Sequence, residues 1–236
     1  MLKYIFVDLD DTIFDFHKAE KIAVSKTLEH FELPHTDDVI KRYHEINKAH
    51  WKMLEKGIIN RSQVKIGRFE SLVSEIADDP EKIDAKELAK YYEKCLSIGH
   101  YFIDGAEKFL KEASGKYKLY LVSNGTAAVQ KGRIESSDIS RYFERIFVSE
   151  NIGFNKPSKE YFDVCFDEIK KCDKDFRKDQ SVIIGDSLTS DISGGINAGI
   201  KTVWFNPNCK KINDDIIPDF EINNFDEFED KVAENF

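Results

Sequence analysis

Hydrophobic residues recur at helical spacing through the segment from residue 15 to residue 98. Four stretches carry apolar side chains about one helical turn apart, with charged residues between them: FDFHKAEKIAVSKTLEHFEL, TDDVIKRYHEINKAHWKMLEKG, RSQVKIGRFESLVSEIAD and DAKELAKYYEKCLSIG. An apolar stripe that repeats every three to four residues is typical of an amphipathic helix. The segment therefore predicts a compact bundle of about four helices.

The pattern changes on both sides of this segment. Short apolar runs typical of buried strands begin with KYIFVD and continue as YKLYLVS, ERIFVS, QSVIIG and KTVWF. Helical stretches separate the later runs, and such alternation predicts an α/β protein with a parallel sheet covered on both faces. We also expect an edge strand near DFEIN and a helix near FDEFEDKVAENF. The core would comprise residues 1–14 and 99–236, and the helical insert residues 15–98.

Charge and cysteine usage narrow the classes of partner. The net charge of −9, without a basic block, argues against a nucleic-acid polymer or an anionic membrane surface. No secretory segment is visible, no apolar run has the length of a membrane span, and the four cysteines form no CxxC pair. We therefore expect a cytoplasmic protein with reduced thiols. Its oligomeric state, monomer or dimer, stays open.

Reactive side chains follow the ends of four predicted strands. In open α/β sheets, ligands bind outside the carboxyl ends of the strands. Carboxylates, a hydroxyl, an amide and an ammonium would therefore gather at one edge of the sheet. They lie in VDLDDT (Asp8, Asp10, Asp11), LVSNG (Ser123, Asn124), GFNKPS (Lys156) and IIGDSLTSD (Asp186, Asp191).

The acidic residues at the first strand end need a positive partner. Asp8, Asp10 and Asp11 repel one another when they are packed together, and no Lys or Arg stands beside them. Asp186 would bring a further carboxylate to the same edge, and a site with only oxygen ligands suits Mg2+. For the first three residues alone, an ordinary acidic turn is the alternative.

The second and third segments could receive an anion. Ser123 and the backbone N–H groups of a helix that opens near Thr126 would form an anion cradle, and Lys156 would add a charge. SNG is equally a good turn sequence, and Lys156 could be a solvated loop lysine. Asp191 could orient Lys156, hydrogen-bond the waters of a metal ion, or be a simple acid in the first turn of a helix.

Together these segments resemble the four motifs of the haloacid dehalogenase-like phosphohydrolases. DLDDT, LVSNG, the lysine of NKPS and GDSLTSD occur in the order of that family, from residue 8 to residue 191. The helical insert is similar to the first cap type of the family. DLDDTIFDF, KPSKEYF and DISGGINAG…TVWFNP most resemble the bacterial 5′-nucleotidase-like subgroup, although many relatives have KPDP at the third motif.

The resemblance implies a Rossmann-like, doubly wound core with an inserted α-helical cap and with Mg2+ as cofactor. Asp8 would be the nucleophile, and Asp10 the general acid/base that also gives its backbone carbonyl to the metal. The implied phosphate-binding residues are Ser123, Asn124 and Lys156. The implied metal site consists of Asp8, Asp10 and Asp186, supported by Asp191 and Thr12.

We therefore expect a phosphoric monoester hydrolase acting on a small phosphorylated metabolite. Nucleoside 5′-monophosphates are the first choice of substrate, hydrolysed through an aspartyl phosphate. Alternatives are a phosphatase of phosphoglycolate or a sugar phosphate, and a sugar phosphomutase. A 2-haloacid dehalogenase, which needs neither Mg2+ nor the second acid, and a phospho-receiver module, which lacks the helical insert, fit less well. The aromatic residues Phe14, Phe16, Tyr43 and Trp51 could stack a base, but the sequence assigns none of them to the site.

Overall fold

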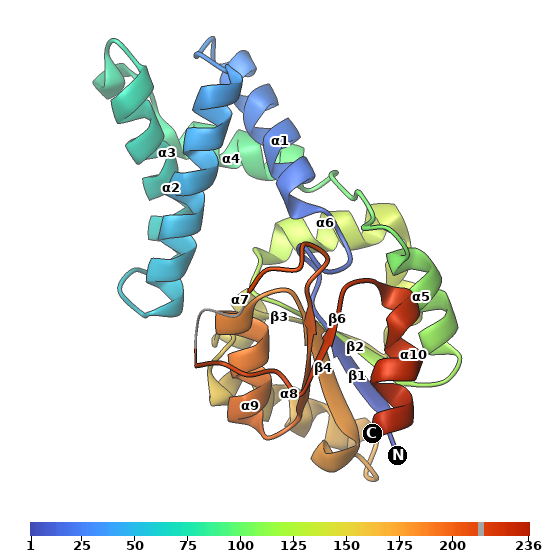
Figure 1. Cartoon of the computed structure of the whole chain (residues 1–236). Coiled ribbons are helices and arrows are strands. Elements are labelled where there is room, and N and C mark those ends of the chain that lie inside the picture. The colour runs from blue at the N-terminus through green and yellow to red at the C-terminus, as the bar shows by residue number, and fades with distance from the viewer. Residues whose placement is uncertain (212–214) are drawn as a thin grey trace.

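A six-stranded sheet forms the centre of the protein in the computed structural model, which describes residues 1–211 and 215–236 (Figure 1). The strand order is β3-β2-β1-β4-β5-β6, and every neighbouring pair is parallel. The strands are β1 (Tyr4–Val7), β2 (Lys118–Ser123), β3 (Arg145–Val148), β4 (Ser181–Gly185), β5 (Lys201–Phe205) and β6 (Phe220–Ile222). These are the six strands that the sequence predicts, with β6 at the edge.

Side chains alternate between the two faces of the sheet, and helices cover both faces. Ile5 and Val7 belong to a hydrophobic cluster that includes residues of α5 (Ala106–Ser114), α6 (Ala127–Ser137) and α10 (Phe228–Lys231). Tyr4 and Phe6 belong to a second cluster with α8 (Lys159–Cys172) and the end of α9 (Ser193–Ala198). Successive residues of a strand point to opposite faces. A strand with apolar residues at every position is therefore stable only between two layers of helices.

The four predicted helices of the insert are present. They are α1 (Phe16–His30), α2 (Asp37–Glu55), α3 (Arg61–Ile76) and α4 (Ala85–Leu96). Each begins after a residue whose side chain accepts a hydrogen bond from the first turn, namely Asp15, Thr36, Asn60 and Asp84. Their apolar faces form a third cluster, separate from those of the sheet. We refer to residues 15–98 as the cap, and the proposed boundaries stay a prediction.

Two elements differ from the expected pattern. The predicted C-terminal helix is α-helical only over Phe228–Lys231, between short 3-10 turns at Phe225–Glu227 and Ala233–Asn235. Helix formation is cooperative, and a segment this short gains few internal hydrogen bonds. The predicted helix after β4 begins as a π-helical turn at Leu188–Ile192 and becomes α-helical only at α9. The remaining short elements are α7 (Ser149–Ile152) and 3-10 turns at Pro80–Lys82, Ile139–Tyr142 and Lys178–Gln180.

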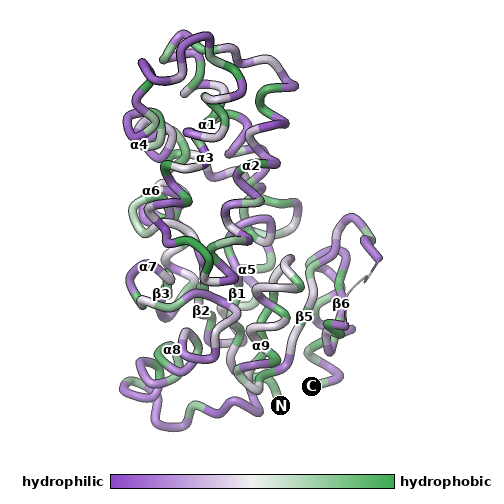
Figure 2. Tube along the Cα trace, turned by 90° about the vertical axis from the view of Figure 1, so that its left-hand side faces the viewer, coloured by the Kyte–Doolittle hydropathy of each residue, from purple (hydrophilic) through white to green (hydrophobic). Residues whose placement is uncertain are grey.

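The topology places a ligand site at the centre of the sheet. From β1 the chain builds outward to β2 and β3 on one side, and then returns to build β4, β5 and β6 on the other side. Ligands bind where the strand order reverses, outside the carboxyl ends of the strands. Figure 2 shows the cap helices standing at one end of the core. Within the described residues, no helix is long and apolar enough to span a membrane.

Candidate active site

Lys156 is the centre of a buried ionic network between three strand ends. Its Nζ lies 2.5 Å from Asp8 Oδ1 and 2.6 Å from Asp191 Oδ1, and it donates a hydrogen bond of 3.0 Å to Val122 O. The lysine and both aspartates are buried. Val122 lies in β2, Asp8 directly follows β1, and Asp191 lies in the turn after β4. One ammonium group therefore ties together segments that are far apart along the chain.

The charges in this network do not balance. Burial raises the pKa of the Asp8 carboxyl, and the negative Asp191 raises it further, although Lys156 acts in the opposite direction. Burial alone would lower the pKa of Lys156, but Asp191 and Asp8 raise it above its ordinary value. The ammonium is therefore firmly protonated while it faces two carboxylates. One positive group therefore faces two acidic groups, and a further cation would be stabilised beside them.

A third carboxylate joins Asp8 and Asp191. One oxygen each of Asp8, Asp186 and Asp191 lie within 4.8 Å of one another. The pKa of Asp186 is raised well above its ordinary value. Burial is the main cause, and the negative charges of Asp191, Asp11 and Asp8 raise it further. Thr12, from the loop after β1, accepts a hydrogen bond of 3.1 Å from Asp186 N and so links the loops that follow β1 and β4.

The two residues of the second motif play different structural roles. Ser123 Oγ accepts hydrogen bonds from Gly125 N (3.0 Å) and from Gln130 Nε2 (2.8 Å) at the end of β2. The side chain of Asn124 instead braces the loop of Lys156. Its Oδ1 accepts from Lys156 N, and its Nδ2 donates to Lys156 O, both at 2.8 Å. The amide thus holds the backbone from which Lys156 reaches into the network.

Asp10 has partners that the sequence analysis missed. Arg133 Nη1 forms a short ion pair with Asp10 Oδ1, and Gln130 Nε2 donates a hydrogen bond of 2.6 Å to Asp10 Oδ2. Gln130 and Arg133 are three residues apart on α6, so they share one face of that helix. Both are almost fully buried. In the sequence, these partners could have been inferred only from two polar residues three positions apart in a helix that was predicted to pack on the core.

A cavity of about 250 Å3 lies between the cap and the strand ends. Of the four aromatic residues considered above, Phe16 and Trp51 line it, whereas Phe14 and Tyr43 are fully buried and lie outside its lining. The further lining residues combine the strand-end groups with cap side chains: Asp8, Asp10, Asp11, Glu55, Arg68, Glu93, Leu96, Ser123, Asn124, Gly125, Thr126, Val129, Gln130, Arg133, Lys156, Asp186, Ser187, Ser190 and Asp191.

Arg61, at the start of α3, connects the cap to the core. Its Nη1 donates to Asn124 O (2.8 Å) and Gly125 O (3.1 Å). Its Nη2 donates to Ser149 Oγ and Asn155 Oδ1, both at 2.6 Å. All four acceptors belong to the segments that follow β2 and β3, so one cap side chain joins the cap to this end of the core. In the sequence, Arg61 is a single arginine that follows the helix cap Asn60, and this position did not predict its contacts with the core.

The site thus combines carboxylates, a lysine and a serine beyond the strands of an α/β sheet, under a helical cap. The sequence pattern of the haloacid dehalogenase-like hydrolases matches residues 4–205. The chain therefore belongs to this family.

Similar proteins span nearly the whole chain. The Bacillus subtilis protein YfnB is 38% identical over 223 residues, which cover 94% of this chain and 92% of YfnB. The pyrimidine 5′-nucleotidase PynA of Streptococcus pneumoniae is 32% identical, covering 99% of this chain and 96% of PynA. The pyrimidine 5′-nucleotidase YjjG of Escherichia coli is 28% identical, covering 98% of each chain. A crystal structure of YfnB bound to magnesium superposes with a TM-score of 0.89 and covers 97% of each chain.

Proposed function

We propose that this protein is a Mg2+-dependent phosphatase of small phosphate monoesters, with pyrimidine nucleoside 5′-monophosphates as its preferred substrates. The observation that carries the proposal is the buried network of Asp8, Lys156 and Asp191, which opens into a cavity beside Ser123. It offers a carboxylate nucleophile and cationic or hydroxyl groups for a phosphate in one place. The similarity to PynA and YjjG over nearly the whole chain supports the substrate class.

The donor atoms at the strand ends fit Mg2+. Asp8, Asp186 and Asp191 offer only oxygen atoms, and Mg2+ prefers oxygen ligands and keeps several waters. Burial and the neighbouring carboxylates raise the pKa values of Asp8 and Asp186, and a cation bound there would act in the opposite direction. We assign Asp8, Asp186 and the backbone carbonyl of Asp10 as ligands. Asp191 accepts hydrogen bonds from Lys156 Nζ and Ser187 N. We therefore assign Asp191, like Thr12, as a residue that holds the metal site in place rather than as a ligand. When bound, Mg2+ would neutralise charge on the phosphoryl oxygens.

Two aspartates would divide the chemical work. A carboxylate oxygen of Asp8 attacks phosphorus, the bond from phosphorus to the ester oxygen breaks, and an aspartyl phosphate forms. Asp10 gives a proton to the departing alkoxide and then takes one from the water that attacks the aspartyl phosphate. Inorganic phosphate and free Asp8 result. Arg133 and Gln130 orient the Asp10 carboxyl toward the cavity, while Ser123 and Lys156 hold phosphate oxygens.

The cap side of the cavity suits a nucleoside. Trp51 and Phe16 offer aromatic faces to a base, and stacking on such faces stabilises base binding by about 1–3 kcal/mol per base. Arg68 and Glu93 line the same cavity and can donate to and accept from polar edges of a base. A sugar phosphate would leave these aromatic faces without a partner.

The deciding experiment measures phosphate release from a panel of substrates with saturating Mg2+ and with excess EDTA. The panel contains pyrimidine and purine nucleoside 5′-monophosphates, hexose phosphates, phosphoglycolate and p-nitrophenyl phosphate. We expect pyrimidine nucleotides to have the highest kcat/KM, and EDTA to abolish turnover. A sugar phosphate or phosphoglycolate that leads tenfold, or by about 1.4 kcal/mol, would reject the substrate class but not the phosphatase. An isomerised sugar phosphate without phosphate release would indicate a phosphomutase, and full activity in EDTA would exclude the metal.

A further inference from the structure

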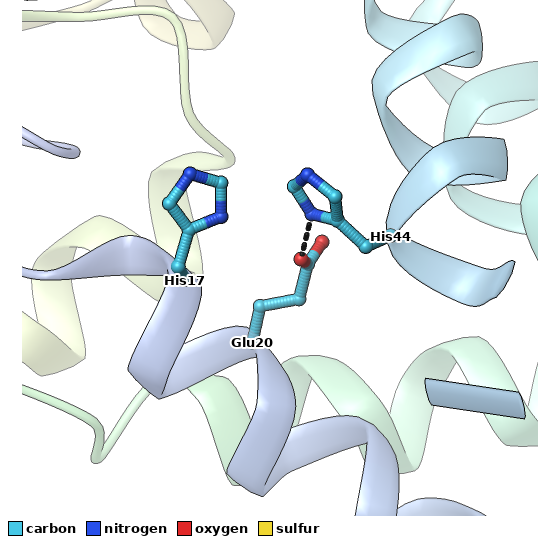
Figure 3. Close-up of side chains that lie close together, drawn as sticks. All are labelled: His17, Glu20 and His44. Atoms are coloured by element: carbon cyan, nitrogen blue, oxygen red, sulfur yellow. Dashed lines mark hydrogen bonds and ion pairs between the residues drawn. The ribbon is translucent and has the colours of Figure 1, made fainter. Parts of the chain in front are cut away.

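Two histidines and a glutamate meet between α1 and α2, outside the cavity lining. His17 and Glu20 are three residues apart on α1 and therefore lie on the same face of that helix. His44 approaches from α2. Figure 3 shows the two imidazole rings and the Glu20 carboxylate converging on one point between the helices. One ligand atom from each residue lies within 4.8 Å of the other two.

Each member of this cluster is held by a further group. Glu20 is buried; its Oε2 lies 2.6 Å from His44 Nδ1, and its Oε1 accepts a hydrogen bond of 2.5 Å from Asn47 Nδ2. Nε2 of His17 lies 3.5 Å from Asp11 Oδ2, which leaves the other ring nitrogen, Nδ1, for the cluster. Metal-bound histidines are commonly oriented in this way, by a carboxylate on the second ring nitrogen.

We propose that His17, Glu20 and His44 form a binding site for a divalent transition metal ion of the Zn2+ type, separate from the Mg2+ site at the strand ends. Two imidazole nitrogens and one carboxylate oxygen are a ligand set that zinc uses when it keeps an open coordination position. The same set is poorly suited to Mg2+, which prefers oxygen alone.

The geometry needs only a small adjustment. Zinc binds nitrogen and oxygen at about 2.0–2.2 Å, which places tetrahedral ligands about 3.3 Å apart. The rings of His17 and His44 are already 4.6 Å apart between their centroids and tilted edge to face. His17 is exposed over 62% of its side chain, so it can rotate with little cost. Glu20 and His44 would exchange their direct hydrogen bond for two bonds to the ion.

The simpler explanation of the cluster is a hydrogen bond between two helices. His44 and Glu20 form this hydrogen bond. It is the main cause of the raised pKa of His44. It does not involve His17, whose ring would then serve only its pair with Asp11. The side chain that distinguishes the two explanations is therefore His17.

Asp11 gives the site a connection to the core. Its Oδ1 accepts hydrogen bonds from Phe16 N (3.0 Å) and His17 N (3.3 Å), at the start of α1. Asp11 also has a positive φ of 57°, in the turn that follows the first strand. A bound ion would thus join α1 to α2 beside the chain segment that leads from the core into the cap.

The test is a Zn2+ titration followed by calorimetry, with untagged protein and enough Mg2+ to fill the strand-end carboxylates. The exposed thiols of Cys172 and Cys209 could bind zinc by themselves, so all variants carry Cys172→Ser and Cys209→Ser. We expect one Zn2+ per chain. Replacing the zinc with Co2+ should give the intense visible absorption of a site with nitrogen ligands and low coordination number, which is a readout independent of activity.

His17→Ala and His44→Ala should each weaken Zn2+ binding at least tenfold, because even an indirect contact to a metal ligand contributes a factor of about 10–100. His35→Ala is the matched control, since His35 is exposed in the loop after α1, where its ring forms a hydrogen bond with the backbone of Leu33. It should leave zinc binding unchanged. Absence of a stoichiometric zinc site would overturn the proposal. So would a zinc affinity that is unchanged by His17→Ala, because the site would then not include that residue.

Discussion

Replacing Lys156 by methionine tests whether the buried network is held together by its single cation. The ammonium lies within 2.6 Å of two buried carboxylates, and methionine keeps the approximate length of the side chain while removing the charge. Asp8 and Asp191 would then face each other without compensation. Removing one partner of a buried ion pair destabilises a protein by about 3–5 kcal/mol. We expect this loss in the free energy of unfolding at pH 8, in the presence of EDTA.

The loss should depend on pH in a defined direction. The folded-state pKa of Asp8 is already raised by burial and by Asp191, and loss of Lys156 raises it further. Between the ordinary pKa of 3.8 and the raised one, the folded protein binds more protons than the unfolded chain. The free energy of unfolding therefore falls as pH rises through this window. In the wild type this window ends at a pKa of about 8, and in Lys156→Met it extends to higher pH. The deficit of Lys156→Met should therefore be smaller at pH 8 than at pH 9.5, by more than about 1 kcal/mol.

Urea denaturation of the wild type and the variant at both pH values measures the deficit. Lys159→Met is the matched control, because Lys159 is an exposed lysine that pairs with Asp163 on the same helix. Exposed pairs of this kind contribute little to stability. The reasoning fails if Lys156→Met resembles this control at pH 8, or if its deficit is equal at pH 8 and pH 9.5.

Two further predictions concern the reaction. Asp8→Asn should abolish both turnover and covalent labelling by p-nitrophenyl phosphate, whereas Asp10→Asn should lose about 10²–10⁴ in kcat and still accumulate phosphate on Asp8. Rapid quenching with mass spectrometry of the peptide decides this, and phosphate on any other residue contradicts the assignment. Arg61→Ala should lower kcat/KM at least tenfold, since the cap loses four hydrogen bonds to the core. Arg42→Ala, which removes only ion pairs within the cap, should not; equal effects of the two variants would reject a specific role for Arg61.

The periodicity of the sequence by itself determined the kinds of element and their order. Apolar runs of four to six residues specify strands buried on both faces, as in β1 and β4, because only a covered parallel sheet buries every position. The helical stripe of the insert specified α1 to α4 through local spacing and through side-chain caps such as Thr36 and Asn60. These signals are local, so they can be seen without knowing which segments meet. The C-terminal helix is shorter than the sequence pattern predicts, because so short a segment gains few helical hydrogen bonds.

The strand-end motifs also predicted which side chains gather, since the carboxyl ends of parallel strands share one edge. The sequence could not predict which of these side chains touch one another. That Asn124 braces the loop of Lys156, or that Arg133 pairs with Asp10, depends on contacts between residues 32 and 123 positions apart.

The tertiary structure alone decided the contacts of the cap. Arg61 reaches acceptors 63 to 94 residues further along the chain, and His44 meets Glu20 only because α2 packs beside α1. Such contacts depend on the angle between packed helices and on the rotamer of each side chain. Both are determined by the whole core rather than by neighbouring residues, so no local pattern records them.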